Sequence, residues 1–285
     1  MPDTALDAFT RARPRLFGIA YRILGSAPDA EDVVQDAWLR WAGGDRTGVR
    51  DPEAFLVVTA TRLALNLAQS AHARREAYVG PWFPTPVDTE SDPQLGAERR
   101  AALELAVLHV LQRLGPAERA AYVLREAFDY PYDRIAEILQ MREPAVRQAV
   151  SRARKRVDGE RRTTASRDRL RTLLDAFLAA AHAGDVAGLE AVLAADVVSE
   201  TDGGGVRRAA RRTVVGGNDV ARFVAGFSTR FWPDAQVRIV EANGQPAALF
   251  LHDGRPSALL CVSADDSGIS QLMWVMNPEK LTDFG

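Results

Sequence analysis

A proline-rich segment is the feature that most constrains how this sequence can fold. Residues 78–86 read Tyr-Val-Gly-Pro-Trp-Phe-Pro-Thr-Pro, and an acidic run with a further proline, Pro93, follows. Proline fixes its own φ, lacks an N–H donor and forces the residue before it into extended geometry, so residues 78–96 cannot form a regular helix. We therefore predict a linker, which would bury Trp82 and Phe83. The length of 285 residues favours about two domains.

The sequence before the linker has the apolar spacing of helices. A first apolar stripe ends at Gly25, and Ser26 with Asp29 three residues later predicts the capped start of a second helix. Glycines at three positions of residues 42–50 indicate a loop. Asp51-Pro52 then predicts the start of a long helix, because proline is favoured at the first helical position.

Helical spacing returns from about residue 97 and ends in a pattern typical of DNA-binding proteins. A short helix is predicted over Asp133–Leu139, and Gln140–Glu143 is predicted to be a turn. In the next helix the apolar residues recur on one face, namely Val146, Ala149, Val150, Ala153 and Val157. This order of elements predicts a helix-turn-helix.

After about residue 171 the pattern changes again. Two short helices are predicted first, and a third is predicted over Asn218–Thr229. Strand-like runs cover Val197–Thr201, Arg207–Val215, Ala235–Ala242, Ala247–His252, Ser257–Ser263 and Ile269–Val275. Turn signals such as Asn243-Gly244 and Asp253-Gly254 favour hairpins. The C-terminal part is therefore predicted to be an α+β module with a curved antiparallel sheet packed on helices.

Composition excludes several classes of protein. Hydrophobic residues make up 47% and charged residues 26%, which is incompatible with a mainly disordered chain. Cys261 is the only cysteine, so neither an intramolecular disulfide nor a cysteine-based zinc site can form. We expect no metal and no other cofactor. The N-terminus has no signal-peptide pattern, and no apolar run approaches the roughly 18 residues that span a bilayer, so a cytoplasmic location is expected.

The formal charge of −2 conceals a strong segregation of charge along the chain. Residues 101–172 carry 15 basic and 10 acidic residues, net +5, whereas residues 173–285 carry 9 and 14, net −5. The first 75 residues are nearly neutral at +1, and residues 76–100 have a net charge of −3. This distribution favours one segment that meets a polyanion and another that does not.

The outer face of the helix-turn-helix is rich in groups that recognise DNA. Arginine and glutamine can contact base edges with two hydrogen bonds, and further arginines can neutralise phosphates. The candidate DNA-binding residues are Arg147, Gln148, Ser151, Arg152, Arg154 and Lys155. A solvated surface helix is the alternative, and the preceding short helix and turn favour DNA.

Two polar faces before the linker are also candidate binding surfaces. One helix flank carries Glu31, Asp32, Gln35, Asp36 and Arg40. Nothing there suppresses a carboxylate charge for acid–base catalysis, so a solvated or partner-binding face is favoured. The long helix from Pro52 presents Arg62, Asn66, Gln69, Arg74 and Arg75. These groups suit single-stranded bases and backbone, although a basic helix end stabilised by the helix dipole is an equal alternative.

Taken in order, several motifs resemble one family. They are Glu31-Asp-Val-Val-Gln-Asp36, Asp51-Pro-Glu-Ala-Phe55, Leu114-Gly-Pro-Ala-Glu-Arg119, and the helix-turn-helix with Arg147-Gln148 and Ser151-Arg-Ala-Arg154. Their order and spacing look like an extracytoplasmic-function (ECF) sigma factor of bacterial RNA polymerase. The resemblance implies two all-α modules, sigma region 2 over residues 1–76 and sigma region 4 over 101–160, joined by a linker over 77–100.

The resemblance implies a role for each surface in promoter recognition, DNA melting and transcription initiation, with no active site of the chain's own. The flank from Glu31 to Arg40 would dock on the β′ clamp helices of core RNA polymerase, and region 4 would meet the β flap. The helix with Arg62 would capture melted non-template bases of the minus-ten element. The helix-turn-helix would read the minus-thirty-five element as duplex, and the linker would thread near the polymerase active-site cleft.

Three further segments resemble the subgroup with a fused SnoaL-like C-terminal domain. They are residues 78–86, Asp202-Gly-Gly-Gly205 and Asn277-Pro-Glu-Lys-Leu281. The resemblance implies that residues 168–285 form a nuclear transport factor 2-like cone that modulates activity in cis, without a separate anti-sigma factor. The interdomain residues would be Trp82, Phe83, Pro84, Asp202, Gly203, Gly204, Gly205, Asn277, Pro278 and Lys280.

Two alternative functions stay open from the residues. A helix-turn-helix regulator would bind duplex DNA without polymerase, usually as a dimer. The C-terminal cone could instead be a small-molecule sensor or an isomerase-type enzyme. The titratable groups available to such an enzyme are His182, Asp196, Glu200, Asp202 and His252, and no pair of them has diagnostic spacing.

Overall fold

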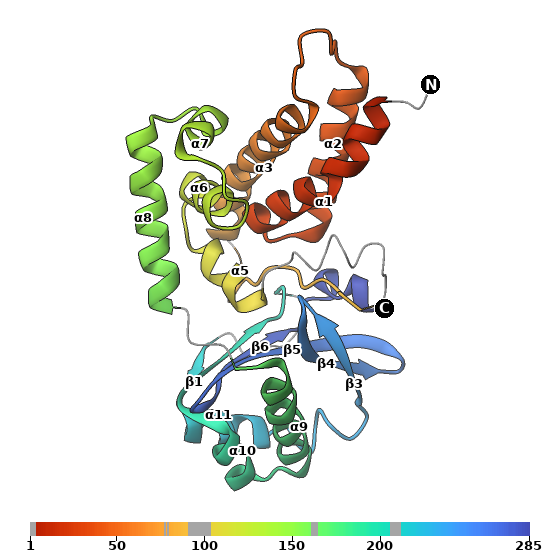
Figure 1. Cartoon of the computed structure of the whole chain (residues 1–285). Helices are drawn as coiled ribbons and strands as arrows, with labels where there is room; N and C mark the ends of the chain where they lie inside the picture. Colours follow the sequence, from red (N-terminus) through yellow and green to blue (C-terminus); the bar gives the residue numbers. More distant parts are fainter. Residues whose placement is uncertain (1–3, 77, 79, 91–103, 161–164, 206–211) are drawn as a thin grey trace. The chain divides into compact units, whose positions relative to one another are not determined.

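The chain folds into two compact units (Figure 1). The computed structural model describes residues 4–76, 78, 80–90, 104–160, 165–205 and 212–285. Unit 1 comprises residues 1–77 and 91–161, and unit 2 comprises residues 78–90 and 162–285. The proline-rich part of the linker therefore belongs to the C-terminal unit. Within the described ranges, no helix combines the length and the apolar character needed to cross a membrane.

The first half of unit 1 consists of three long helices, α1 (Thr4–Leu24), α2 (Ala27–Gly43) and α3 (Pro52–Glu76). The predicted boundaries are confirmed: Gly25 follows α1 with a φ of +67°, and the Ser26 hydroxyl accepts the backbone N–H of Asp29 at 3.3 Å. The three helices bury a common apolar core, which includes Leu16, Ile19, Tyr21, Val34, Ala37, Leu56, Val57 and Ala60. Polar faces of α2 and α3 are thereby left to solvent.

The second half of unit 1 contains α5 (Leu105–Gln112), α6 (Pro116–Glu126), α7 (Tyr132–Leu139) and α8 (Glu143–Glu160). The last two form the predicted helix-turn-helix. All five apolar positions predicted for one face of α8 are at most 2% exposed, so the polar residues of this helix face away from the core. The start of the helix predicted from about residue 97 lies outside the described residues.

Unit 2 is an α+β module, as predicted. Its helices are α9 (Arg167–Ala183), α10 (Val186–Val192) and α11 (Gly217–Ala225). Its strands are β1 (Leu193–Asp202), β2 (Val214–Val215), β3 (Gln236–Ala242), β4 (Gln245–His252), β5 (Arg255–Asp265) and β6 (Gly268–Val275). Two short 3-10 turns end the chain, η1 (Pro278–Lys280) and η2 (Thr282–Phe284). Residues 207–211 of the second predicted strand lie outside the described residues.

The six strands form one open sheet in the order β2-β1-β6-β5-β4-β3, with α9, α10 and α11 beside it (Figure 1). Four strand pairings are antiparallel, and β1 pairs with β6 in parallel. The hairpin turns are those predicted, because Asn243-Gly244 and Asp253-Gly254 have positive φ at both positions. The apolar core between helices and sheet includes Phe177, Trp232, Phe250 and Leu272. The sheet is therefore mixed, whereas an antiparallel sheet was predicted. Its packing on helices is the arrangement that the SnoaL-like resemblance implies.

The turn of the helix-turn-helix offers a test of local geometry. Gln140 ends α7 with a φ of +54° and a ψ of +42°, a left-handed conformation that glycine adopts without strain. We expect Gln140→Gly to raise the free energy of unfolding by about 1 kcal/mol, measured by urea denaturation of the full chain. The matched control is Gln148→Gly in the middle of α8, which should lower it by a similar amount. Destabilisation by both substitutions would contradict the prediction.

Candidate functional site

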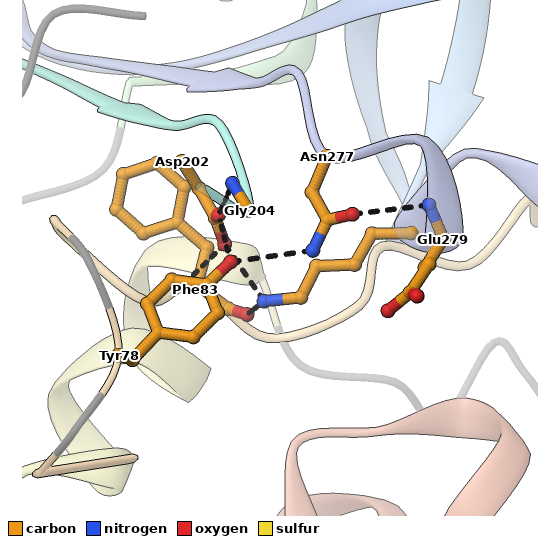
Figure 2. Close-up of polar contacts among 7 residues, drawn as sticks. Tyr78, Phe83, Asp202, Gly204, Asn277 and Glu279 are labelled. Carbon is orange, nitrogen blue, oxygen red and sulfur yellow. Dashed lines mark hydrogen bonds and ion pairs between the residues drawn. The ribbon is translucent and has the colours of Figure 1, made fainter. Parts of the chain in front are cut away.

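The carboxylate of Asp202, at the end of β1, holds the linker to the C-terminal unit. It is fully buried and accepts four hydrogen bonds (Figure 2). Oδ1 accepts the Tyr78 hydroxyl at 2.5 Å and the Gly204 N–H at 3.1 Å. Oδ2 accepts the Phe83 N–H at 2.9 Å and the Lys280 ammonium at 2.7 Å. A buried carboxylate is tolerated only when it is paired and hydrogen-bonded in this way.

Lys280 supplies the positive charge of this site. Its ammonium also donates to the Phe83 carbonyl at 2.5 Å and lies over the rings of Trp82, at 4.2 Å, and Tyr78, at 5.5 Å from the centroid. Only 7% of this lysine is exposed. The two aromatic faces and the oxygen atoms thus replace the water that the ammonium loses.

Asn277 fixes the turn that carries Lys280. Its Oδ1 accepts the N–H of Glu279 at 3.1 Å, and its Nδ2 donates to the Tyr78 hydroxyl at 3.2 Å (Figure 2). Gly204 makes room for this amide: it has a φ of +66°, and a Cβ there would lie 2.7 Å from the Asn277 Cγ. No other residue type fits that position without displacing the asparagine.

The linker cluster, defined as Tyr78, Trp82, Phe83, Asp202, Gly204, Asn277 and Lys280, unites most of the predicted interdomain residues. Of the others, Pro84 and Gly203 are buried, Pro278 begins η1, and Gly205 is exposed. Tyr78 lies in the linker motif but was not predicted as a site residue. Its partner is 124 residues away in the sequence, so no local spacing could have identified it.

The linker is held at a second place beyond this cluster. Val87 exchanges two hydrogen bonds with Asn243, through the asparagine backbone N–H and side-chain oxygen, both at 3.0 Å. The Thr89 hydroxyl donates to the carboxylate of Glu241 at 2.8 Å. The linker is therefore fixed to other parts of unit 2 at Tyr78, Phe83, Val87 and Thr89.

The recognition helix α8 carries the predicted duplex-binding residues on its exposed surface. Arg147 lies at the flank, where it makes two hydrogen bonds to one oxygen of Glu143 and stacks over the ring of Tyr132, 4.4 Å from the centroid. These contacts fix the direction of its guanidinium.

Carboxylates of α6 hold two further arginines of α8. Arg152 pairs with Glu118 at 3.3 Å, and Arg154 pairs with Glu126 at 2.6 Å. Between these flanks lie Gln148, Ser151 and Lys155, which are exposed on the face opposite the buried residues of the helix. They are the predicted residues of this helix that point most directly away from the protein.

The predicted surfaces of α2 and α3 are exposed as well. On α2, the exposed residues beside Leu39, which is itself 59% exposed, are Asp32, Gln35, Asp36 and Arg40. Glu31 is half-buried and pairs with Arg13.

On α3, the positions of Arg62, Asn66 and Gln69 follow one another at helical spacing and all three are exposed. Arg62 donates to the backbone carbonyls of Glu137 and Ile138 in α7, at 3.1 and 3.0 Å. The side chains of Arg74 and Arg75 lie outside the described residues.

The groups considered for an enzyme in the C-terminal module are dispersed or occupied. Asp202 belongs to the linker cluster. Both ring nitrogens of His252 are within hydrogen-bond distance of oxygen atoms, those of Ser257 and Phe231. The His182 ring packs edge-on against Trp232, with centroids 6.0 Å apart, and Asp196 is exposed. Glu200 accepts a hydrogen bond from the Thr213 hydroxyl at 3.2 Å. Among the described residues, no hydrogen bond joins any two of these five groups.

Comparisons with known proteins define the class of this chain. The Sigma-70 region 2 family matches residues 8–75, and the Sigma-70 region 4 family matches residues 94–157. Both regions are parts of sigma factors, the proteins that bind core RNA polymerase and direct it to promoter DNA. Sigma factors are not enzymes, and the polymerase performs the chemistry.

Full-length relatives identify the family. ECF RNA polymerase sigma factor SigJ of Mycobacterium tuberculosis is 35% identical, covering 97% of this chain and 93% of the relative. A probable ECF RNA polymerase sigma factor of the same organism, SigI, is 31% identical over 98% and 95%. The crystal structure of M. tuberculosis SigJ matches 98% of both chains, with a TM-score of 0.79 and 33% identity. The chain belongs to the ECF RNA polymerase sigma factors.

The linker cluster predicts a dependence of stability on alkaline pH. Burial, followed by the hydrogen bond to Asp202 and its charge, raises the pKa of the Tyr78 hydroxyl well above its usual value near 10. The folded state therefore favours the neutral phenol, and this stabilisation is complete below pH 10 and lost as the pH rises above it. Urea unfolding at pH 8, 10 and 11 should show a smaller decline for Tyr78→Phe than for the wild type. Equal declines would contradict the prediction.

Proposed function

We propose that this sigma factor is regulated in cis by its C-terminal unit, which holds the linker between the two promoter-reading regions. The supporting observation is the buried Asp202 carboxylate, whose partners include two linker residues and the C-terminal Lys280. The sequence resemblance expects the linker to thread near the polymerase active-site cleft. A linker fixed at Tyr78, Phe83, Val87 and Thr89 is not available for that path, so its capture restrains initiation.

The polymerase contact is proposed for the exposed flank of α2. Asp32, Gln35 and Asp36 present negative and amide groups around the exposed Leu39. An apolar side chain within a charged rim is the usual composition of a protein interface. The proposed partner is the pair of β′ clamp helices, with the β flap as the partner of region 4. A protein that works on polymerase acts in the cytoplasm, and the regulation in cis leaves no need for a separate anti-sigma factor.

The minus-ten element is proposed to bind α3. Arg62, Asn66 and Gln69 line one exposed face and offer a cation and two amides to unstacked bases and their backbone. Extruding a base from the duplex costs a few kcal/mol, which such contacts offset.

The minus-thirty-five element is proposed to bind α8 as duplex. We assign base reading to Gln148 and Ser151, because they face directly away from the protein. Arg147 is assigned to a phosphate, because Glu143 and Tyr132 hold it at the flank of the helix.

A small ligand inside the C-terminal sheet is a subordinate proposal. Two polar atoms at the helix-covered core, the Ser199 hydroxyl and the Trp274 indole nitrogen, are buried without a hydrogen-bond partner among the described residues. Buried polar atoms are normally satisfied, and a small ligand with hydrogen-bonding groups would supply the missing partners.

The assignment on α8 predicts different effects for neighbouring residues. Gln148→Ala should reduce discrimination at one base pair of the minus-thirty-five element by about 1–3 kcal/mol. Arg147→Ala should weaken binding to all sequences alike and lower the salt dependence by about one phosphate contact. Both are measured by titrating holoenzyme with duplexes substituted at each position, with Arg171→Ala in unit 2 as the control. Base-specific loss in Arg147→Ala would overturn the assignment.

The capture of the linker predicts that breaking the ion pair releases it. Lys280→Met removes the charge and keeps the length, and leaving a buried partner uncompensated costs about 3–5 kcal/mol. We expect faster chymotrypsin cleavage after Trp82 and a several-fold increase in transcription by core polymerase.

The matched control is Arg171→Met, which removes an exposed ion pair with Asp175 in the same unit and should change neither measurement. If cleavage increased while transcription stayed at the wild-type level, the linker would be captured without regulating initiation. Unchanged cleavage would show that the cluster does not hold the linker.

A further inference from the structure

Two glutamates of α6 contact the flanks of the recognition helix α8. Glu118 accepts a hydrogen bond from Arg152 at 3.3 Å, and Glu126 accepts one from Arg154 at 2.6 Å. The two arginines are two positions apart in the sequence, which places them about 200° apart around the helix. A single neighbouring helix therefore supplies a carboxylate to an arginine on each flank of α8.

The arginines are the outer members of both pairs. The side chain of Arg152 is 65% exposed, against 20% for Glu118, and that of Arg154 is 50% exposed, against 31% for Glu126. A polyanion that approaches α8 thus meets each guanidinium first, with the carboxylate behind it. Each pair presents a cation whose direction is fixed and whose charge is opposed by the carboxylate.

Stability of the fold does not explain these two pairs. An exposed ion pair adds little to stability, because solvent screens the charges and ordering two long side chains costs entropy. Glu126 is also the last residue of α6, where the negative end of the helix dipole disfavours a carboxylate. Its contact with Arg154 therefore points to a role in the function of α8.

The electrostatics of DNA indicate what that role is. Non-specific binding comes almost entirely from neutralisation of phosphates, and it needs no particular register. A free arginine reaches phosphates in many registers, because its side chain is long. An arginine held by a carboxylate binds a phosphate at no cost only where the phosphate lies in the direction that the guanidinium already has.

We propose that Glu118 and Glu126 are positioning residues that determine specificity, because they direct the flanking arginines of α8 toward the phosphates of one register. The proposal rests on the proposed docking of α8 in duplex DNA. A helix in the major groove has a phosphate backbone on either side, so arginines on opposite flanks meet one strand each. In every other register the carboxylates oppose binding, because they neutralise the arginines and repel phosphate.

The effect is measured as a ratio of two affinities. Removing the carboxylates frees two cations, which strengthens binding to DNA of any sequence. In the correct register the gain in charge is offset by the loss of the fixed direction, so binding there changes less. Specificity is the difference between the two binding free energies, and it therefore falls.

The double variant Glu118→Gln/Glu126→Gln, as full chain assembled with core polymerase, tests the proposal. The specific probe is a promoter duplex that wild-type holoenzyme selects from random DNA. The non-specific probe is the same duplex with a scrambled minus-thirty-five element. We expect the ratio of the two affinities to fall about three- to tenfold. Binding to the scrambled probe should also depend more steeply on salt, by up to about two phosphate contacts.

The matched control is Glu137→Gln, because the Glu137 carboxylate pairs with Arg134 within α7. This substitution removes a carboxylate charge from the same region and should leave the ratio unchanged. If the control lowered the ratio as much as the double variant, net charge would account for the effect and the proposal would be wrong. An unchanged ratio in the double variant would overturn it as well.

A double-mutant cycle tests whether the carboxylate acts through its arginine. In an Arg154→Gln background, Glu126→Gln should change neither the ratio nor the salt dependence, because no arginine is left to position. A loss equal to that in the wild-type background would show that Glu126 acts on DNA without Arg154, which contradicts the proposal.

Failure of the proposed duplex reading can be recognised separately. Gln148→Ala is measured on the same two probes. If it lowers the ratio while the double variant does not, α8 reads the duplex, but the carboxylates do not determine specificity. If neither lowers the ratio, the proposed role of α8 is wrong, and the role of the two glutamates is wrong with it.

Discussion

The structure depends on the requirement that a buried charge be satisfied completely. Asp202 and Lys280 meet this requirement with each other and with linker groups, and Arg119 meets it with five oxygen atoms from two regions. Removing any partner leaves an ionised group in a poorly solvated place, which costs far more than an exposed ion pair contributes. A few buried charged side chains therefore hold together segments that are distant in the sequence.

Part of the connection between regions 2 and 4 belongs to the C-terminal unit. The chain leaves unit 1 after residue 77, contributes residues 78–90 to unit 2, and returns to unit 1 at residue 91. The segment that joins the two promoter-reading regions is thus built into the C-terminal unit.

Much of the fold follows from local sequence signals. The Ser26 cap, the Gly25 stop, the glycine hairpins and the apolar face of α8 are set by residues within a few positions of each other, and they were predicted correctly. The parallel pairing of β1 with β6 was not, since it joins strands about 70 residues apart, for example at Ser199 and Leu272. Strand periodicity alone does not specify the direction of a distant partner.

The residues of the candidate sites divide in the same way, into those that local spacing predicts and those whose partners are distant in the sequence. The exposed polar faces of α2, α3 and α8 follow from helical spacing, so their members could be predicted. The roles of Tyr78 and of Arg119 toward region 2 could not, because their partners are set by tertiary packing. The family resemblance supplied Asp202, Asn277 and Lys280 as a set, but the chemistry that joins them becomes visible only from their contacts.

The scarcity of lysine in this sequence gives the buried Lys280 a further consequence. The chain has only two lysines, Lys155 and Lys280, and the first is exposed on α8 while the second is enclosed by Asp202 and Trp82. An amine is acylated only when it is accessible and deprotonated. Acylation of Lys155 would thus decrease when DNA covers α8. Acylation of Lys280 would increase when the linker is released. Two chemically identical amines therefore report on two separate events in one molecule.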